Sequence, residues 1–137
     1  MLLISFAIAG CSGHRTTAHV SSAPDPMLAE VGAELFKSYC ASCHGVVARG
    51  GGPVAPELIT PPSDLSRIAA RNGGVFPESS IVRVIDGRFE LPVHGTREMP
   101  VWGTRLAEEI PYFATGEEVA RGRITSLVEY LKSLQVP

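Results

Sequence analysis

Two adjoining stretches decide the fold of this chain: Met27-Leu-Ala-Glu-Val-Gly-Ala-Glu-Leu-Phe-Lys-Ser-Tyr39 and Cys40-Ala-Ser-Cys-His44. Apolar side chains recur in the first stretch at the three- and four-residue spacing of one helical face, namely Leu28, Val31, Leu35 and Tyr39. Pro26 precedes the stretch, and proline is well suited to the first turn of a helix. The sequence therefore predicts an amphipathic helix over residues 27–39, followed at once by two thiols and an imidazole.

The second stretch has the pattern C-x-x-C-H, which is typical of covalent haem c attachment. One helical turn separates the sulfurs of Cys40 and Cys43 enough for them to reach the two vinyl groups of a porphyrin. His44 would then lie beneath the iron and offer a neutral imidazole nitrogen as its fifth ligand. The other ring nitrogen needs an acceptor, and a carbonyl of the following glycine-rich loop, such as that of Pro53, is expected to serve. The sequence thus predicts one haem c as the cofactor.

Three other kinds of site use two cysteines at this spacing: a redox-active dithiol, a local disulfide and half of a zinc site. A thioredoxin-like dithiol is expected near a strand and a βαβ pattern, whereas Cys40 and Cys43 follow an amphipathic helix. A structural zinc site needs four Cys or His ligands, and after His44 the next candidates are distant and isolated. Haem attachment is therefore favoured over all three.

A methionine is the expected second axial ligand of the iron, because a soft thioether favours ferrous iron and raises the reduction potential. Met1 lies in the apolar N-terminus and Met27 opens the first helix, which leaves Met99. Pro100 follows Met99 and favours a stiff, extended backbone that presses the sulfur towards the iron. The alternative is that Met99 only fills the core and His94 is the ligand, which would give a bis-histidine site of lower potential.

Three further helices are predicted from caps and apolar spacing. The last follows the capping residue Thr115 and carries an apolar stripe of Ile124, Leu127, Val128, Leu131 and Leu134. Two shorter helices are expected before it, each with its own start and stop residues: 64–71 between Ser63 and Asn72-Gly73, and 78–86 between Pro77 and Gly87. No alternating strand pattern of useful length competes, so the chain is predicted to form a small all-α domain.

The predicted loops are long, at residues 45–62 and 87–116, consistent with 14 Gly and 11 Pro in 137 residues. Loops of this length count against so small a domain unless they enclose something other than protein, and a bound cofactor resolves that objection. The charges nearly balance, with 12 Lys+Arg against 14 Asp+Glu, so no nucleic-acid partner is expected.

The N-terminal residues predict export. Residues 1–10 form an uncharged apolar stretch that is too short to span a bilayer and fits a signal peptide. The run Ile8-Ala-Gly-Cys11 resembles the lipobox of bacterial lipoproteins, which implies that Cys11 is lipidated and becomes the new N-terminus; an ordinary signal peptide is the alternative. Residues 11–26 are rich in Ser, Thr and Pro, which is typical of a flexible tether, and the folded domain is expected over residues 27–137.

Several runs together resemble the bacterial mono-haem class I c-type cytochromes, over roughly residues 27–135. They are Gly32 and Phe36 in the first helix, Cys40-Ala-Ser-Cys-His44, Pro61-Pro-Ser-Asp-Leu65, Asn72-Gly-Gly-Val-Phe-Pro77, Ile85-Asp-Gly87, His94-Gly-Thr-Arg-Glu-Met-Pro-Val-Trp-Gly103 and Tyr130-Leu-Lys-Ser-Leu134. The resemblance implies a small class I cytochrome c fold, with crossed terminal helices and with shorter helices and long loops wrapped around one haem. It also implies that Phe36 meets Tyr130, and Gly32 would let the two helices approach closely.

Three features of the second half have two interpretations each. Trp102 either donates its indole N–H to a haem propionate or packs at the edge of its loop. The segment 104–115 is longer than a minimal member of the family needs, and forms either a short helix over the haem edge or a contact with a partner. Gly122 interrupts the last helix, which either starts late or bends there.

The expected function is electron transfer rather than enzymatic catalysis, with His44 and Met99 bound throughout the ferric and ferrous states. Redox proteins are the expected partners, with no small-molecule substrate. The lipid on Cys11 would hold the domain on the periplasmic side of a bacterial membrane, and by resemblance Ser12 favours the outer membrane. Two alternatives stay open: a haem enzyme or gas or peroxide sensor with a displaceable sixth ligand, and an electron-entry subunit of a respiratory or dehydrogenase complex.

Overall fold

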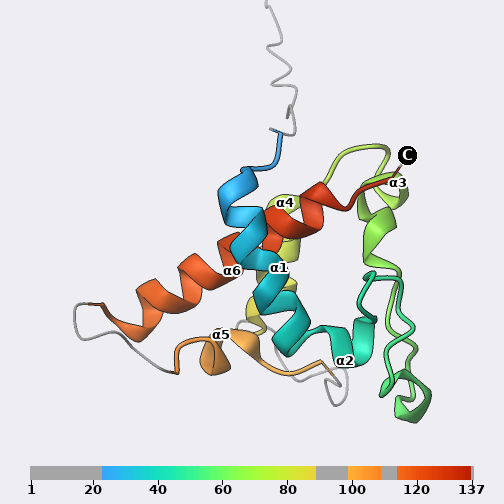
Figure 1. Cartoon of the computed structure of the whole chain (residues 1–137), viewed down its shortest axis with the longest axis horizontal. Helices are drawn as coiled ribbons and strands as arrows, with labels where there is room; N and C mark the ends of the chain where they lie inside the picture. Colours follow the sequence, from blue (N-terminus) through green and yellow to red (C-terminus); the bar gives the residue numbers. More distant parts are fainter. Residues whose placement is uncertain (1–22, 89–98, 109–113, 137) are drawn as a thin grey trace, which may run out of the picture.

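The computed structural model describes residues 23–88, 99–108 and 114–136, and every regular element within them is helical (Figure 1). The longer helices are α1 (Pro26–Tyr39), α4 (Glu78–Asp86) and α6 (Gly116–Ser133). The shorter elements are α2 (Ala41–His44), the 3-10 turns η1 (Ala55–Glu57) and η2 (Leu65–Arg67), α3 (Ile68–Arg71) and α5 (Trp102–Arg105). The predicted all-α class is confirmed. None of the described helices is long and apolar enough to pass through a membrane.

Helices α1 and α6 cross each other at the centre of the fold (Figure 1). At the crossing, Gly32 lies so close to the backbone carbonyl of Ser126 that a Cβ atom on Gly32 would overlap with it. The rings of Phe36 and Tyr130 meet nearby, with centroids 5.3 Å apart and planes inclined at 51°. The crossed helices, the close approach at Gly32 and the aromatic contact are thus confirmed.

The hydrophobic core is built around one face of α6. Four side chains on this face are at most 4% exposed: Ile124, Leu127, Val128 and Leu131. Phe36 of α1 and Leu106, directly after α5, are equally buried. Full burial of one such side chain stabilises a fold by about 1.5–3 kcal/mol. The same core therefore fixes both α1, which leads to Cys40, and α5, which follows Met99.

Side-chain caps begin both terminal helices. The Asp25 carboxylate accepts hydrogen bonds from the backbone N–H groups of Met27 and Leu28, at 2.9 and 3.1 Å, and so starts α1. Thr115 caps α6 as predicted, in a reciprocal pair of bonds with Glu118. Helix α6 is continuous from Gly116 to Ser133, so it does not start late at Gly122.

The helix expected over residues 64–71 differs from its prediction. Its cap is Asp64 rather than Ser63, because the Asp64 carboxylate accepts from both the N–H and the hydroxyl of Ser66, at 2.9 and 2.6 Å. This local bonding holds η2 in the tighter 3-10 form, and only the four residues of α3 are α-helical. Helix α4, by contrast, has the predicted bounds and ends at Gly87 in the left-handed conformation, with φ 68°.

Candidate functional site

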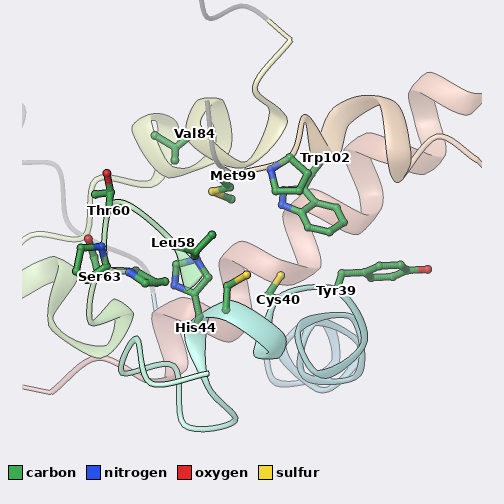
Figure 2. Close-up of a pocket in the computed structure, with 13 residues that line it drawn as sticks. Tyr39, Cys40, His44, Leu58, Thr60, Ser63, Val84, Met99 and Trp102 are labelled. Atoms are coloured by element: carbon green, nitrogen blue, oxygen red, sulfur yellow. The ribbon is translucent and has the colours of Figure 1, made fainter. Parts of the chain in front are cut away.

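A cavity of about 400 Å³ lies between the end of α1, α2, α4 and the segment 99–102 (Figure 2). Its volume falls within the range of small-molecule and cofactor sites. Its lining is mostly apolar and comprises Tyr39, Cys40, Cys43, His44, Leu58, Thr60, Pro61, Pro62, Ser63, Val84, Met99, Pro100 and Trp102. The structure thus brings five of the predicted site residues to one place: Cys40, Cys43, His44, Met99 and Trp102.

Both cysteines and His44 belong to one short turn. Cys40 ends α1, where its N–H donates to the carbonyl of Phe36 at 2.8 Å, and α2 begins with the next residue. The N–H of His44 donates to the carbonyl of Cys40 at 2.9 Å, which closes the turn that carries the two sulfurs. Cys40 and Cys43 are free thiols, so the structure does not form the local disulfide.

The glycine-rich loop folds back over α2 and satisfies its last carbonyls. Three N–H groups of the loop donate to the turn at 2.8–3.1 Å: Gly50 to His44, Gly52 to Cys43 and Val54 to Ser42. Gly52 packs so closely that a Cβ atom there would overlap with the Ser42 carbonyl. Gly45 ends α2 with φ 73°, a conformation that glycine adopts without strain. These bonds fix α2, and with it the orientation of His44.

The imidazole of His44 is half-buried, and its surroundings favour the neutral form. Burial lowers its pKa below the ordinary value, and a hydrogen bond with the Ser63 backbone opposes this only in part. Its Nδ1 atom is buried and has no hydrogen-bond partner among the described residues. The expected bond to the Pro53 carbonyl is therefore not formed in this structure. Pro53 is exposed and does not line the cavity, and its neighbours Gly52 and Val54 donate hydrogen bonds to carbonyls of α2.

The Cys40 thiol does not resemble the nucleophile of a redox dithiol. Burial, together with the neighbouring Cys43, raises its pKa to about 12. Reactive cysteines have a lowered pKa, because the thiolate is the attacking form. A zinc site is not supported either, because the described residues contain no group of three or more His, Cys, Asp or Glu side chains that could hold a metal ion.

Met99 and Trp102 enter the cavity from the side opposite Cys40 and His44 (Figure 2). Met99 is half-buried, and Pro100 separates it from the residues that lead into α5. The ring of Trp102 lies edge-on to that of Tyr39, with centroids 5.8 Å apart and planes inclined at 61°. Trp102 thus packs at the edge of the cavity, and its bond to a propionate stays a prediction.

The loop 45–62 was expected to enclose the cofactor, but the sequence did not predict which of its residues line the cavity. They are Leu58, Thr60, Pro61 and Pro62, joined by Ser63 and by Val84 of α4. The pair Pro61-Pro62 was a usable signal, because adjacent prolines hold the backbone extended beside a site. Other predictions lie outside the described residues: the signal peptide, the lipidated Cys11 and the alternative ligand His94.

The donors of the cavity fit a haem c. Two thiols one helical turn apart can both attach to one porphyrin, and the neutral imidazole offers a nitrogen to iron. The thioether of Met99 lies across the cavity from that imidazole (Figure 2). Imidazole nitrogen and thioether sulfur are both established axial ligands of haem iron. The apolar lining between them suits a porphyrin ring.

Comparison with known proteins agrees with this chemistry. The family model described as cytochrome c oxidase, cbb3-type, subunit III matches residues 28–110, which is more than half of the chain. A Rhizobium leguminosarum bv. viciae protein named Cbb3-type cytochrome c oxidase subunit FixPc is 36% identical over 85 residues, covering 61% of this chain but only 24% of that protein. No solved structure matches. The chain therefore belongs to the cbb3-type subunit III family, and is a bacterial class I c-type cytochrome, an electron-transfer protein of covalently bound haem c.

Proposed function

We propose that Cys40 and Cys43 hold a single haem c through thioether bonds and that His44 and Met99 are its axial ligands. One observation carries this proposal: two thiols, a neutral imidazole and a thioether converge on one apolar cavity (Figure 2). When bound, haem iron supplies a one-electron change between its ferric and ferrous states.

The residues that line the cavity would bind the iron and surround the porphyrin. His44 offers an uncharged imidazole, because burial lowers its pKa. Met99 offers a soft sulfur, which favours the ferrous state and raises the reduction potential. Leu58, Val84 and the pair Pro61-Pro62 line the cavity with apolar surface, which would contact the porphyrin. No bond of a substrate is made or broken.

Optical spectra of the ferric protein test the axial ligands. We expect the wild type to show the weak far-red charge-transfer band of methionine-ligated haem, and Met99→Ala to lose it while keeping its covalent haem. Met27→Ala is the matched control, because Met27 is 76% exposed on α1 and does not line the cavity. A wild type without the band would mean that Met99 is not bound, either because His94 is the ligand or because the sixth position is open, as in a haem enzyme or a gas or peroxide sensor.

The proposed partner is a respiratory oxidase, with the chain as its electron-entry subunit rather than a free shuttle. The support is the name of the family and of the Rhizobium relative, which is an oxidase subunit. Purification in mild detergent tests this proposal. Co-purification with larger haem-containing subunits would support the subunit role, whereas a chain that elutes alone at low and high ionic strength would support a shuttle between redox proteins.

The proposed location is the periplasmic side of a membrane, held by a lipid on Cys11 and the tether 11–26. Because Asp25 caps α1 and Pro26 begins it, the tether ends before Asp25. A flexible tether of about this length spans roughly 20 Å on average, enough for the domain to turn near the surface. We expect Cys11→Ser to release the protein from membranes. Membrane fractionation of the wild type then identifies the membrane that holds the protein. A role as oxidase subunit predicts the membrane that contains the oxidase, whereas Ser12 after Cys11 favours the outer membrane.

A further inference from the structure

The end of α4 forms an ion pair that is not part of the cavity wall. Gly87, in the left-handed conformation, turns the chain so that Arg88 comes back to Asp86. The Arg88 guanidinium then donates two hydrogen bonds of 2.7 Å to the Asp86 carboxylate, from Nε to Oδ1 and from Nη2 to Oδ2. The Asp86 side chain is 10% exposed and the Arg88 side chain 27%, so the carboxylate side of this bidentate pair is shielded from water.

The other edge of the same guanidinium reaches α6. Arg88 Nη1 donates to Glu117 Oε2 at 2.6 Å, in the first turn of that helix. Arg88 therefore joins the last residue of α4 to the beginning of α6. We call Asp86, Arg88 and Glu117 the Arg88 clamp.

Helix α5 rests directly on this clamp. A Cβ atom on Gly103 would overlap with Arg88 Nε and Asp86 Oδ1, so only a hydrogen atom separates the α5 backbone from the ion pair. Gly103 follows Trp102 and lies four residues after Met99. The segment 99–103, which we call the Met99 arm, thus ends on the clamp.

A second contact holds the far end of α5. Arg123 of α6 donates from Nη1 to the carbonyls of Leu106 and Glu108, at 3.0 and 2.9 Å. Leu106 itself is buried in the core. The Met99 arm therefore leaves a fixed helix, and the Arg88 clamp determines how close that helix lies to α4 and the cavity.

We propose that the Arg88 clamp is a positioning element that keeps the Met99 arm closed over the cavity and thereby strengthens the bond between Met99 and the iron. The inference rests on the proposed ligation by Met99. Two-pronged, charge-assisted hydrogen bonds are strong and directional, so they suit the fixing of a ligand-bearing segment. Loss of the clamp raises the fraction of molecules with Met99 displaced, and an external ligand then binds more tightly in proportion to that fraction.

Imidazole titration of the ferric holoprotein at pH 7, followed by the far-red band, measures that fraction. The neutral form of imidazole, which is present at this pH, binds ferric iron and competes directly with Met99. We expect Arg88→Gln to tighten apparent imidazole binding by about tenfold to hundredfold, the scale set by charge-assisted hydrogen bonds. Arg88→Lys, which keeps the charge but loses the fork, should give an intermediate value.

Three variants separate positioning from other effects. Arg121 also pairs with Glu117, at 3.6 Å, but its side chain is 72% exposed. Arg121→Gln therefore removes one positive charge beside Glu117 without touching Asp86 or α5, and should leave imidazole binding unchanged. Glu117→Gln removes the negative charge from the outer half of the clamp, at a side chain that is 52% exposed, so it serves if Arg88→Gln does not fold. In a Met99→Ala background, Arg88→Gln should have no further effect, because no methionine remains to be displaced.

The outcomes are distinct. Wild-type imidazole affinity in both Arg88→Gln and Glu117→Gln overturns the proposal, and so does an equal change in Arg121→Gln or a persistent change in the Met99→Ala background. A wild-type protein without the far-red band shows instead that Met99 is not the ligand, which overturns the proposed function and this inference together.

Discussion

Gly32 of α1 lies directly against the backbone carbonyl of Ser126 in α6, with no space for a side chain between them. This contact sets the distance at which the two helices cross. Helix α1 ends at the turn with Cys40 and His44, and Arg123 of α6 holds the backbone after α5. The helix crossing therefore positions both walls of the cavity.

A methyl group at Gly32 should loosen this crossing. We expect Gly32→Ala to lower the free energy of unfolding of the holoprotein by about 1–3 kcal/mol, because the added Cβ forces the helices apart. Gly122→Ala, in α6 itself, is the control: nothing lies within 4 Å of its Cβ, and alanine should stabilise the helix by about 0.5–1 kcal/mol. Urea unfolding measures both, and equal effects of the same sign would contradict the account.

The loop over α2 offers a second matched pair of glycines. Gly52→Ala should place a methyl group into the Ser42 carbonyl and break the bonds that fix His44, at a cost of about 1–3 kcal/mol. Gly51→Ala, one residue earlier, meets nothing within 4 Å and should be close to neutral. The readouts are the thermal midpoint and the yield of haem-loaded protein. A loss at Gly51 as large as that at Gly52 would refute this explanation.

Asp86 should make stability depend on pH in the acid range. Its hydrogen bonds from Arg88 hold the pKa of the Asp86 carboxyl below its ordinary value in the folded state. The ionised form therefore stabilises the fold fully above the unfolded pKa of about 3.9, and this contribution is lost as the pH falls through the lower folded pKa. Asp86→Asn should be less stable than wild type by about 1.5–3 kcal/mol at pH 7. The difference in unfolding free energy between wild type and Asp86→Asn should shrink below about pH 4. A difference that stays constant from pH 7 to pH 3 would be incompatible with stabilisation by the ionised carboxylate.

Replacement of Met99 by histidine should lower the midpoint potential while keeping six ligands. Imidazole is a harder ligand than a thioether and favours ferric iron, so the midpoint potential should decrease, by less than the roughly 0.8 V over which axial ligands tune haem potentials. The far-red band should disappear because no methionine is bound. Potentiometric titration with optical detection measures the change. An unaltered potential in Met99→His would mean that another residue occupies the sixth position.

Features determined by neighbouring residues could be predicted from local sequence patterns, whereas the distant contact between Phe36 and Tyr130 was predicted only through the family resemblance. The spacing in α1, the turn from Cys40 to His44 and the stop at Gly87 are local, and all were predicted correctly. Ser63 and Asp64 are both good caps, and only the bonds to Ser66 decide between them.

The unpredicted parts of the site depend on tertiary structure. Arg88 and Glu117 are 29 residues apart, and no local pattern joins them. Which residues of the loop line the cavity depends on how the loop folds back over α2, and residue spacing does not predict that path.

The most direct test of the central claim is the intact mass of the protein after maturation with export and haem-attachment machinery. The account predicts that the mass exceeds that of the polypeptide and any acyl groups by one haem, and that a Cys40→Ala, Cys43→Ala double variant loses this increment. A wild-type mass equal to the amino acids plus acyl groups alone would contradict it.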